Sequence, residues 1–101
     1  MRPAELIRFK QSGRAITVLT AWDSLSASLV QEAGADVVLV GDSASNVVAG
    51  HETTLPITLD QMVYHAASVV RAVARALVVV DLPFGTYQAD SKEACALPYA
   101  L

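Results

Sequence analysis

A chain of 101 residues is long enough for one modest domain, and a content of 53% hydrophobic and 17% charged residues excludes intrinsic disorder. The formal net charge is -3 and the seven Lys and Arg are spread singly along the chain, so we expect no nucleic-acid or membrane partner. The longest apolar stretches are far shorter than the roughly 20 residues that span a bilayer, and the charged N-terminus does not resemble a signal peptide, which predicts a soluble, cytoplasmic protein. Cys95 is the only cysteine, which excludes an internal disulfide and a cysteine metal cluster within one chain.

A short helix is expected first, because Pro3 suits a first helical turn and Gly13 offers a left-handed stop. Residues Ile16 to Thr20 are rich in β-branched side chains and predict a strand. Asp23 follows this strand but directly precedes a helical pattern, which favours a capping role, and Gly34 can end that helix. The apolar residues expected on one side of this helix are Leu25, Leu29, Val30 and Ala33.

Two further apolar runs predict buried strands, and the first suits a strand that is covered on both faces. Val37 to Val40 has no polar alternation and ends at Gly41-Asp42, and Leu77 to Val80 ends in a similar way at Asp81. After the first of these runs comes a long segment of small residues that reaches Ile57. Loops of this length are often functional or mobile, so this segment is a candidate for function.

A longer helix is predicted between the long segment and the last strand. Thr58 and Gln61 form a capping box at its start. Its apolar positions recur at helical spacing and are Met62, Ala66, Val69, Val70 and Val73. A second capping box, Asp90 with Glu93, predicts another helix near the end of the sequence, although Pro98 follows only a few residues later.

Alternating strands and helices with these spacings favour right-handed parallel crossovers, which places the chain in the α/β class. Three strands suit either a doubly wound sheet or a (β/α)8 barrel. No Gly-rich phosphate loop follows any strand, so the nucleotide-binding reading loses its main support. On the barrel interpretation, residues 1–101 are a single partial domain: a short helix followed by the N-terminal three βα units. The complete barrel fold normally needs about 250 residues.

Acidic residues that end parallel strands can converge, because the C-terminal ends of all parallel strands point to one side. Asp42 and Asp81 each follow an apolar run of at least four residues. Two carboxylates that face one another repel unless a proton or cation lies between them, and Mg²⁺ prefers oxygen ligands while keeping positions open for water or substrate. We interpret the pair as a magnesium site for a 2-oxo acid. The alternative, that both residues merely cap the following elements, stays open.

Five short segments resemble the ketopantoate hydroxymethyltransferase family, in this order along nearly the whole chain. They are Thr20-Ala21-Trp22-Asp23, Val40-Gly41-Asp42-Ser43, the run from Gly50 to Thr58, Tyr64-His65, and Asp81-Leu82-Pro83-Phe84. The resemblance implies a (β/α)8 barrel of the type found in the phosphoenolpyruvate and pyruvate enzymes, assembled as a homo-oligomer.

The resemblance also implies a reaction in pantothenate biosynthesis. In this family 3-methyl-2-oxobutanoate binds Mg²⁺, is deprotonated to an enolate and attacks the one-carbon unit of the co-substrate 5,10-methylenetetrahydrofolate, giving ketopantoate and tetrahydrofolate. Carried over to this sequence, the family pattern makes Asp42 and Asp81 magnesium ligands that also border the substrate, and makes Ser43 a contact of the substrate carboxylate. From turn preferences alone, Ser43 would be a hydroxyl at a turn or a helix start.

The general base, a substrate-binding lysine and a third carboxylate ligand lie on later strands in this family, so no catalytic residue is assigned within residues 1–101. Lys92 and Glu93 match no catalytic motif and are not candidates. His51 and His65 lack the spacing of a metal pair, so we expect both to be structural or to support neighbouring groups. Trp22 stands where related sequences often carry tyrosine, and we expect it to pack near the barrel mouth.

Three departures from the family pattern bear on activity. Ser45-Asn46 stands where a Gly-Met pair is common, Ala72 where the family tends to have a helix-ending glycine, and Pro98 where it continues a helix. Two alternatives therefore remain: the chain alone is a truncated, non-catalytic fragment or assembly piece of that enzyme, or it belongs to a related magnesium-dependent 2-oxo acid lyase or mutase. The run from Gly50 to Thr58 argues against the lyase or mutase.

Overall fold

The computed structural model describes residues 1–88 and 91–92, which form a parallel β-sheet with helices packed on one side. The elements are, in chain order, α1 (Pro3–Gln11), β1 (Val18–Thr20), α2 (Ser24–Glu32), β2 (Val37–Val40), α3 (Ala44–Val47), α4 (Leu59–Ala72) and β3 (Leu77–Val80). The predicted α/β class is confirmed. The expected capping box of Asp90 with Glu93, together with Cys95 and Pro98, lies outside the described residues. Within those residues, no helix combines the length and the hydrophobicity that a bilayer span requires.

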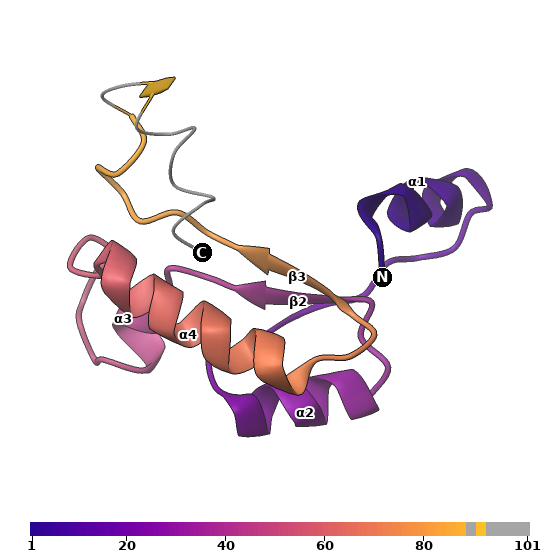
Figure 1. Ribbon diagram of the computed structural model, residues 1–101, viewed down its shortest axis with the longest axis horizontal. Coiled ribbons are helices and arrows are strands. Elements are labelled where there is room, and N and C mark those ends of the chain that lie inside the picture. The colour runs from indigo at the N-terminus through magenta and orange to yellow at the C-terminus, as the bar shows by residue number, and fades with distance from the viewer. Residues whose placement is uncertain (89–90, 93–101) are drawn as a thin grey trace.

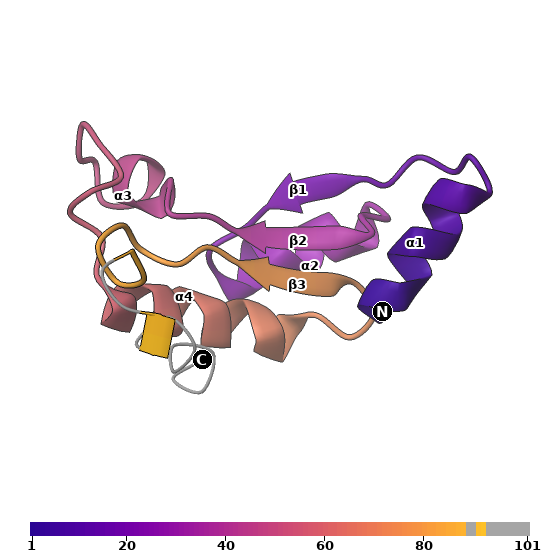
Figure 2. The same ribbon diagram turned by 90° about the horizontal axis from the view of Figure 1, so that it is seen from above.

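The sheet has the strand order β1-β2-β3, and both pairs of neighbours are parallel. Figure 2 shows the three arrows side by side and pointing the same way, with α1 beyond their N-terminal ends and α3 beyond their C-terminal ends. β1 begins at Val18, two residues later than predicted from Ile16. The backbone N–H of Thr17 donates to a carboxylate oxygen of Asp36 at 3.0 Å, so this residue is bonded to a side chain where the strand was expected to start.

The core lies between the sheet and the helices α2 and α4, which cover the same face (Figure 1). Its fully buried side chains include Val38 and Val40 of β2 and Met62 and Val69 of α4. These residues come from the two continuous apolar patterns of the sequence, a strand with no polar alternation and a helix with a 3.6-residue period. The core therefore joins the middle strand to the longest helix.

The apolar side predicted for α2 is only partly buried. Val30 packs against the core, whereas Leu25 and Leu29 are 72% and 58% exposed, and Ala27 takes the fully buried position. Among the described elements, α2 has α4 as its neighbouring helix, and the small side chain of Ala27 allows close approach to the sheet. Hydrophobic periodicity gives the side of a helix that can be covered, but the neighbouring elements decide how much of it is covered.

The predicted helix boundaries are confirmed at several positions. Gly13 and Gly34 have φ values of 76° and 93°, the left-handed conformation expected where glycine ends a helix. In the capping box of α4, the Gln61 backbone N–H donates to Thr58 Oγ1 at 3.2 Å and the Thr58 N–H donates to Gln61 Oε1 at 2.9 Å. Local hydrogen-bond chemistry, which the sequence displays directly, thus sets where these helices begin and end.

Asp23 caps α2 as expected, because its Oδ1 accepts a hydrogen bond from the Ser26 backbone N–H at 2.7 Å. Hydrogen bonding to the side chain and then to the backbone of Ser26 lowers the pKa of Asp23. A carboxyl whose pKa is lower in the folded state adds stability above its unfolded pKa, and this contribution is lost as the pH falls through the folded pKa.

The substitution Asp23→Ala is therefore expected to lower the free energy of unfolding by about 1 kcal/mol at neutral pH, and by less in acid. Asp23→Asn is the matched control, because the amide oxygen caps the helix but does not titrate. Urea unfolding measured from pH 7 down to pH 3 checks this. A difference between wild type and Asp23→Ala that does not change with pH would contradict the assignment.

Candidate functional site

The structure brings Asp42 and Asp81 together at the C-terminal ends of two neighbouring strands. Val40 of β2 is in register with Val80 of β3, so both chains leave the sheet at the same level. The Asp81 backbone N–H donates to the Val40 carbonyl at 3.0 Å, and the Asp42 backbone N–H donates to Asp81 Oδ2 at 3.1 Å. The convergence expected from the strand ends is thus present, and one carboxylate is already oriented by the backbone of the other aspartate.

Gly41 leaves the space for this approach. A Cβ atom built on Gly41 would lie 3.3 Å from Ser43 Oγ and 3.4 Å from Asp81 Oδ2. The first distance is tighter than most real Cβ contacts, so a side chain here would press on the serine hydroxyl beside the Asp81 carboxylate. Glycine thus leaves the hydroxyl and the carboxylate room to lie against the backbone, whereas a larger residue would require Ser43 Oγ to shift.

Ser43 stands at the start of α3, as its alternative interpretation predicted, but its hydroxyl does not cap the helix. The side chain is half-buried, and its Oγ lies on the same side of Gly41 as Asp81 Oδ2. A hydroxyl that lies on the same side of Gly41 as the Asp81 carboxylate and does not cap the helix is available as a donor to a bound anion. Asp42, Ser43 and Asp81 therefore form one cluster at this end of the sheet, which we call the strand-end cluster.

The long segment after β2 contains the short helix α3, which the sequence reasoning missed. Ser45 is 1% exposed, and its Oγ donates to the Thr53 carbonyl at 2.7 Å. Asn46 Nδ2 donates to the His51 carbonyl at 2.9 Å, and the His51 backbone N–H donates to the Ser45 carbonyl at 2.9 Å. Ser45 and Asn46, which depart from the family pattern, therefore form hydrogen bonds that connect α3 to the following part of the loop. His51 contributes its backbone N–H and carbonyl.

Trp22 and His65 lie beside the strand-end cluster. Trp22 lies two residues after the end of β1, is half-buried and packs against the core. Its indole Nε1–H donates to the Gly41 carbonyl at 2.9 Å, and its own carbonyl lies 3.0 Å from Nδ1 of His65 on α4. The structure thus gives Trp22 a polar contact in addition to the expected packing.

The donors of the strand-end cluster suit a hard cation. Mg²⁺ is commonly bound through one or two carboxylates and keeps several water ligands, and Asp42 and Asp81 supply such a pair at one rim. Across residues 1–88 and 91–92, no group of three or more His, Cys, Asp or Glu side chains is arranged to hold a metal. A cation at this rim would therefore take its remaining ligands from water, substrate or other parts of the protein.

The family model described as ketopantoate hydroxymethyltransferase matches residues 1–101. This chain belongs to that family. Among similar proteins, 3-methyl-2-oxobutanoate hydroxymethyltransferase of Flavobacterium johnsoniae is 71% identical over 89 residues, which are 88% of this chain and 33% of the relative. The enzyme of the same name from Synechococcus sp. (strain CC9311) is 63% identical over 101 aligned residues, which cover 95% of this chain and 37% of the relative. The chain thus spans about a third of the length of the relatives that it matches.

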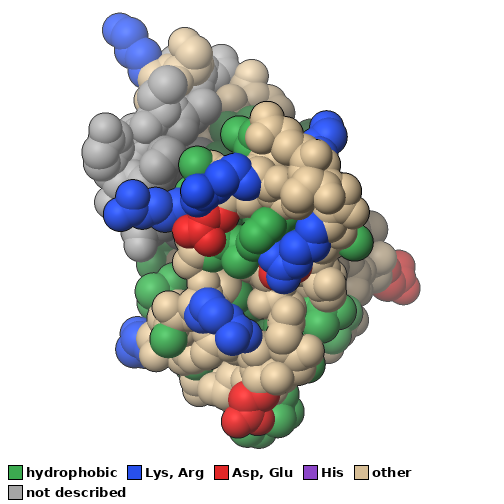
Figure 3. Space-filling view, turned by 90° about the vertical axis from the view of Figure 1, so that its right-hand side faces the viewer, with side chains coloured by type: hydrophobic (Ala, Val, Ile, Leu, Met, Phe, Trp, Pro, Cys, Tyr) green, Lys and Arg blue, Asp and Glu red, His purple; other side chains and the backbone are tan. Residues whose placement is uncertain are grey.

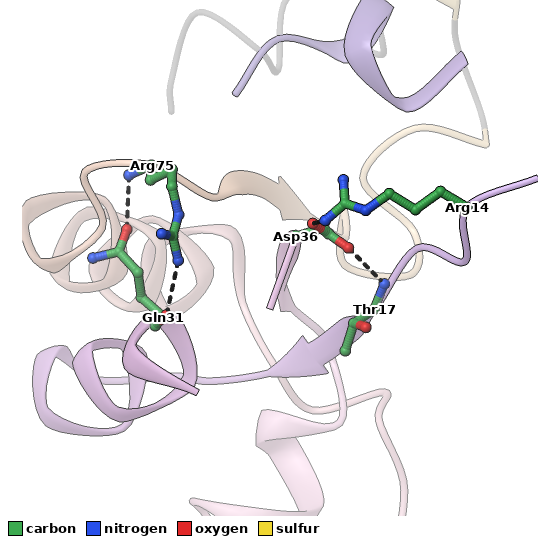
Figure 4. A network of polar contacts seen from close by, with 5 residues as sticks. All are labelled: Arg14, Thr17, Gln31, Asp36 and Arg75. Carbon is green, nitrogen blue, oxygen red and sulfur yellow. Dashed lines mark hydrogen bonds and ion pairs between the residues drawn. The ribbon is translucent and has the colours of Figure 1, made fainter. Parts of the chain in front are cut away.

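A buried acid, Asp36, lies at the end of the sheet opposite the strand-end cluster. The sequence analysis did not single it out. Asp36 is 6% exposed, and its carboxylate accepts hydrogen bonds from Arg14 Nη2 and from the Thr17 backbone N–H, both at 3.0 Å. Figure 4 shows this group beside Gln31 and Arg75, where Gln31 Oε1 accepts the Arg75 backbone N–H at 2.7 Å. The clue in the sequence was an acid directly before the apolar run of β2.

The end of the molecule around Asp36 carries mixed charge around an apolar centre (Figure 3). A groove of about 590 Å³ lies there, and its lining includes Phe9, Arg14, Asp36 and Arg75. Arg14 also stacks on Phe9, with its guanidinium carbon 3.8 Å from the ring centre. Because Asp36 accepts hydrogen bonds from both Arg14 and the Thr17 backbone, it attaches the segment between α1 and β1 to this end of the sheet.

Proposed function

We propose that this chain is the N-terminal part of an enzyme that transfers a hydroxymethyl group from 5,10-methylenetetrahydrofolate to 3-methyl-2-oxobutanoate, giving ketopantoate for pantothenate biosynthesis in the cytoplasm. The observation that carries the proposal is the meeting of Asp42 and Asp81 at one rim in a chain of this family. The names of the relatives supply the reaction at the level of the enzyme. The folate donor and the metal are part of the proposal.

The strand-end cluster has a role for each of its side chains. The carboxylates of Asp42 and Asp81 would hold Mg²⁺, and they would border the 2-oxo acid bound beside it. When bound, the ion supplies a positive charge that favours the enolate form of the substrate. Ser43 donates its hydroxyl to the substrate carboxylate and so fixes which end of the substrate faces the metal. The general base is expected from a part of the enzyme beyond residue 101.

We further propose that the sheet is the first part of a (β/α)8 barrel and that residues 1–101 are one partial domain. Side chains alternate along a strand, so the in-register row of Thr20, Leu39 and Val79 lies on the face away from α2 and α4. Leu39, which is half-buried, and Val79, which is 41% exposed, are apolar, whereas Thr20 is polar, so most of this row on the second face is apolar as well. A parallel sheet with two apolar faces is the pattern of a barrel wall, whose inner face packs in layers.

The test is a chimera in which this chain replaces the matching third of the Flavobacterium johnsoniae relative. We expect the purified chimera to form ketopantoate from 3-methyl-2-oxobutanoate and 5,10-methylenetetrahydrofolate, to lose activity with a chelator and to regain it with Mg²⁺. The isolated chain is the matched control and should show no turnover, because the base lies elsewhere. Size-exclusion chromatography of the chimera would test the proposed homo-oligomer. A folded chimera that makes no ketopantoate would refute the proposal in favour of a non-catalytic or assembly piece.

A further inference from the structure

The peptide group between Gly41 and Asp42 is hydrogen-bonded at both ends. Its carbonyl, on Gly41, accepts the indole Nε1–H of Trp22 at 2.9 Å, and its N–H, on Asp42, donates to Asp81 Oδ2 at 3.1 Å. Hydrogen bonds in series polarise one another, so a donor on the carbonyl makes the N–H of the same peptide a stronger donor. One peptide plane thus connects the indole to the Asp81 carboxylate and also carries the Cα of Asp42.

Trp22 is itself held from the helix layer. Its carbonyl lies 3.0 Å from Nδ1 of His65, and a carbonyl oxygen can only accept, so Nδ1 carries the proton in this contact. The edge of the Tyr64 ring meets the His65 ring, with the ring centres 5.7 Å apart and the planes at 76°. The contacts therefore run from His65 on α4, through Trp22 after β1, to the peptide after β2 and the carboxylate after β3.

We propose that Trp22 and His65 are positioning residues for the strand-end cluster, because they fix the plane of the Gly41–Asp42 peptide and, through it, both carboxylates. This inference rests on the proposed metal-dependent function of that cluster. Side chains that orient ligands from behind typically change metal affinity by about 10- to 100-fold when they are replaced. The contact with Gly41 is a directed hydrogen bond, so it requires an N–H donor on the ring. Apolar packing of the ring requires only its shape.

Trp22→Phe separates the hydrogen bond from the packing, because phenylalanine keeps an aromatic ring in the core but has no N–H. In the 101-residue chain, with Mn²⁺ as the probe and electron paramagnetic resonance as the readout, we expect Trp22→Phe to bind the ion about tenfold more weakly than wild type. Tyr64→Phe is the matched control. It removes a hydroxyl from an exposed ring on α4, the helix that carries His65, and it should leave the Mn²⁺ affinity unchanged. Where wild type binds Mn²⁺ more tightly than Asp42→Asn does, an unchanged affinity in Trp22→Phe would overturn the inference.

His65 supplies a second variant pair that does not alter the aromatic core. His65→Ala should weaken Mn²⁺ binding, and His65→Asn should restore much of it, because the asparagine amide places a donor near the position of Nδ1. Equal affinities for His65→Ala and wild type would count against the role of His65. Failure of His65→Asn to recover any affinity would also count against a directed hydrogen bond.

A metal-free readout separates this inference from the proposed function. If wild type binds Mn²⁺ no better than Asp42→Asn does, the metal site is refuted, and amide hydrogen exchange at Asp42 decides the positioning role. We expect this amide to exchange about tenfold faster in Trp22→Phe than in wild type, because its bond to Asp81 is weakened. An exchange rate that is the same in both proteins would overturn the inference whatever the metal result.

Discussion

Asp42→Asn is expected to lower the kcat of the chimera by about a hundredfold to a thousandfold. Losses of this size are typical when an enzyme loses one group that stabilises the negative charge of the transition state. Asparagine has the same shape as aspartate but no charge, so it is a weak ligand for Mg²⁺. Asp81→Asn should act in the same direction. Its amide oxygen can still accept the Asp42 N–H, which now lies 3.1 Å from the carboxylate, so the strand ends should stay together.

The measurement combines turnover of the chimera with Mn²⁺ affinity and the free energy of unfolding of each variant. Metal affinity and turnover should fall together, whereas stability should change little. Asp36→Asn is the matched control for charge, because it neutralises the aspartate directly before β2, whereas Asp42 follows the other end of that strand. Turnover that persists in both Asp42→Asn and Asp81→Asn would contradict the assigned site.

Asp36→Ala is expected to lower the free energy of unfolding by about 2 kcal/mol, the typical cost of removing a buried acceptor from charged and backbone donors. The Asp36 side chain is 7% exposed and bonds both Arg14 and the Thr17 backbone. Without it, the Thr17 N–H loses its acceptor, and the segment between α1 and β1 loses its attachment to the sheet.

Arg14→Ala is the control that shows how much of the lost stability comes from the ion pair and how much from the Thr17 hydrogen bond. The Arg14 side chain is 51% exposed, so its ion pair is screened by solvent and its removal should cost about 1 kcal/mol or less. Chemical denaturation of the three proteins at neutral pH would measure both differences. If Arg14→Ala proves as costly as Asp36→Ala, the ion pair rather than the Thr17 hydrogen bond carries the stability. Mn²⁺ affinity should be unchanged in either variant, because Asp36 and the strand-end cluster lie at opposite ends of β2.

The sequence was sufficient for the strand-end cluster because two local rules combine there. An apolar run without alternation predicts a buried parallel strand, which is confirmed for β2 but not for β3, where Val79 is 41% exposed, and the residue after such a run emerges at the rim. Asp42 and Asp81 follow such runs, and the register of β2 with β3 brings them together. Their interpretation as magnesium ligands remains a prediction, whereas their convergence is confirmed. Ser43 was placed beside them by the family resemblance, and its hydroxyl lies next to Gly41.

By itself, then, the sequence determined where α2 begins and ends, where α4 begins, the succession of strands along the chain and the rim at which the acids emerge, because caps, turns and hydrophobic periods are interactions between near neighbours. Only the tertiary structure decided how Asp36 is buried against Arg14, why Leu25 is exposed, and which carbonyl the Trp22 indole meets. The partners in the first and last of these contacts are separated by 22 and 19 residues. Such pairings depend on how strands and helices pack in space, which no local pattern encodes. The strand-end cluster joins both levels, since sequence placed its carboxylates and packing set the peptide between them.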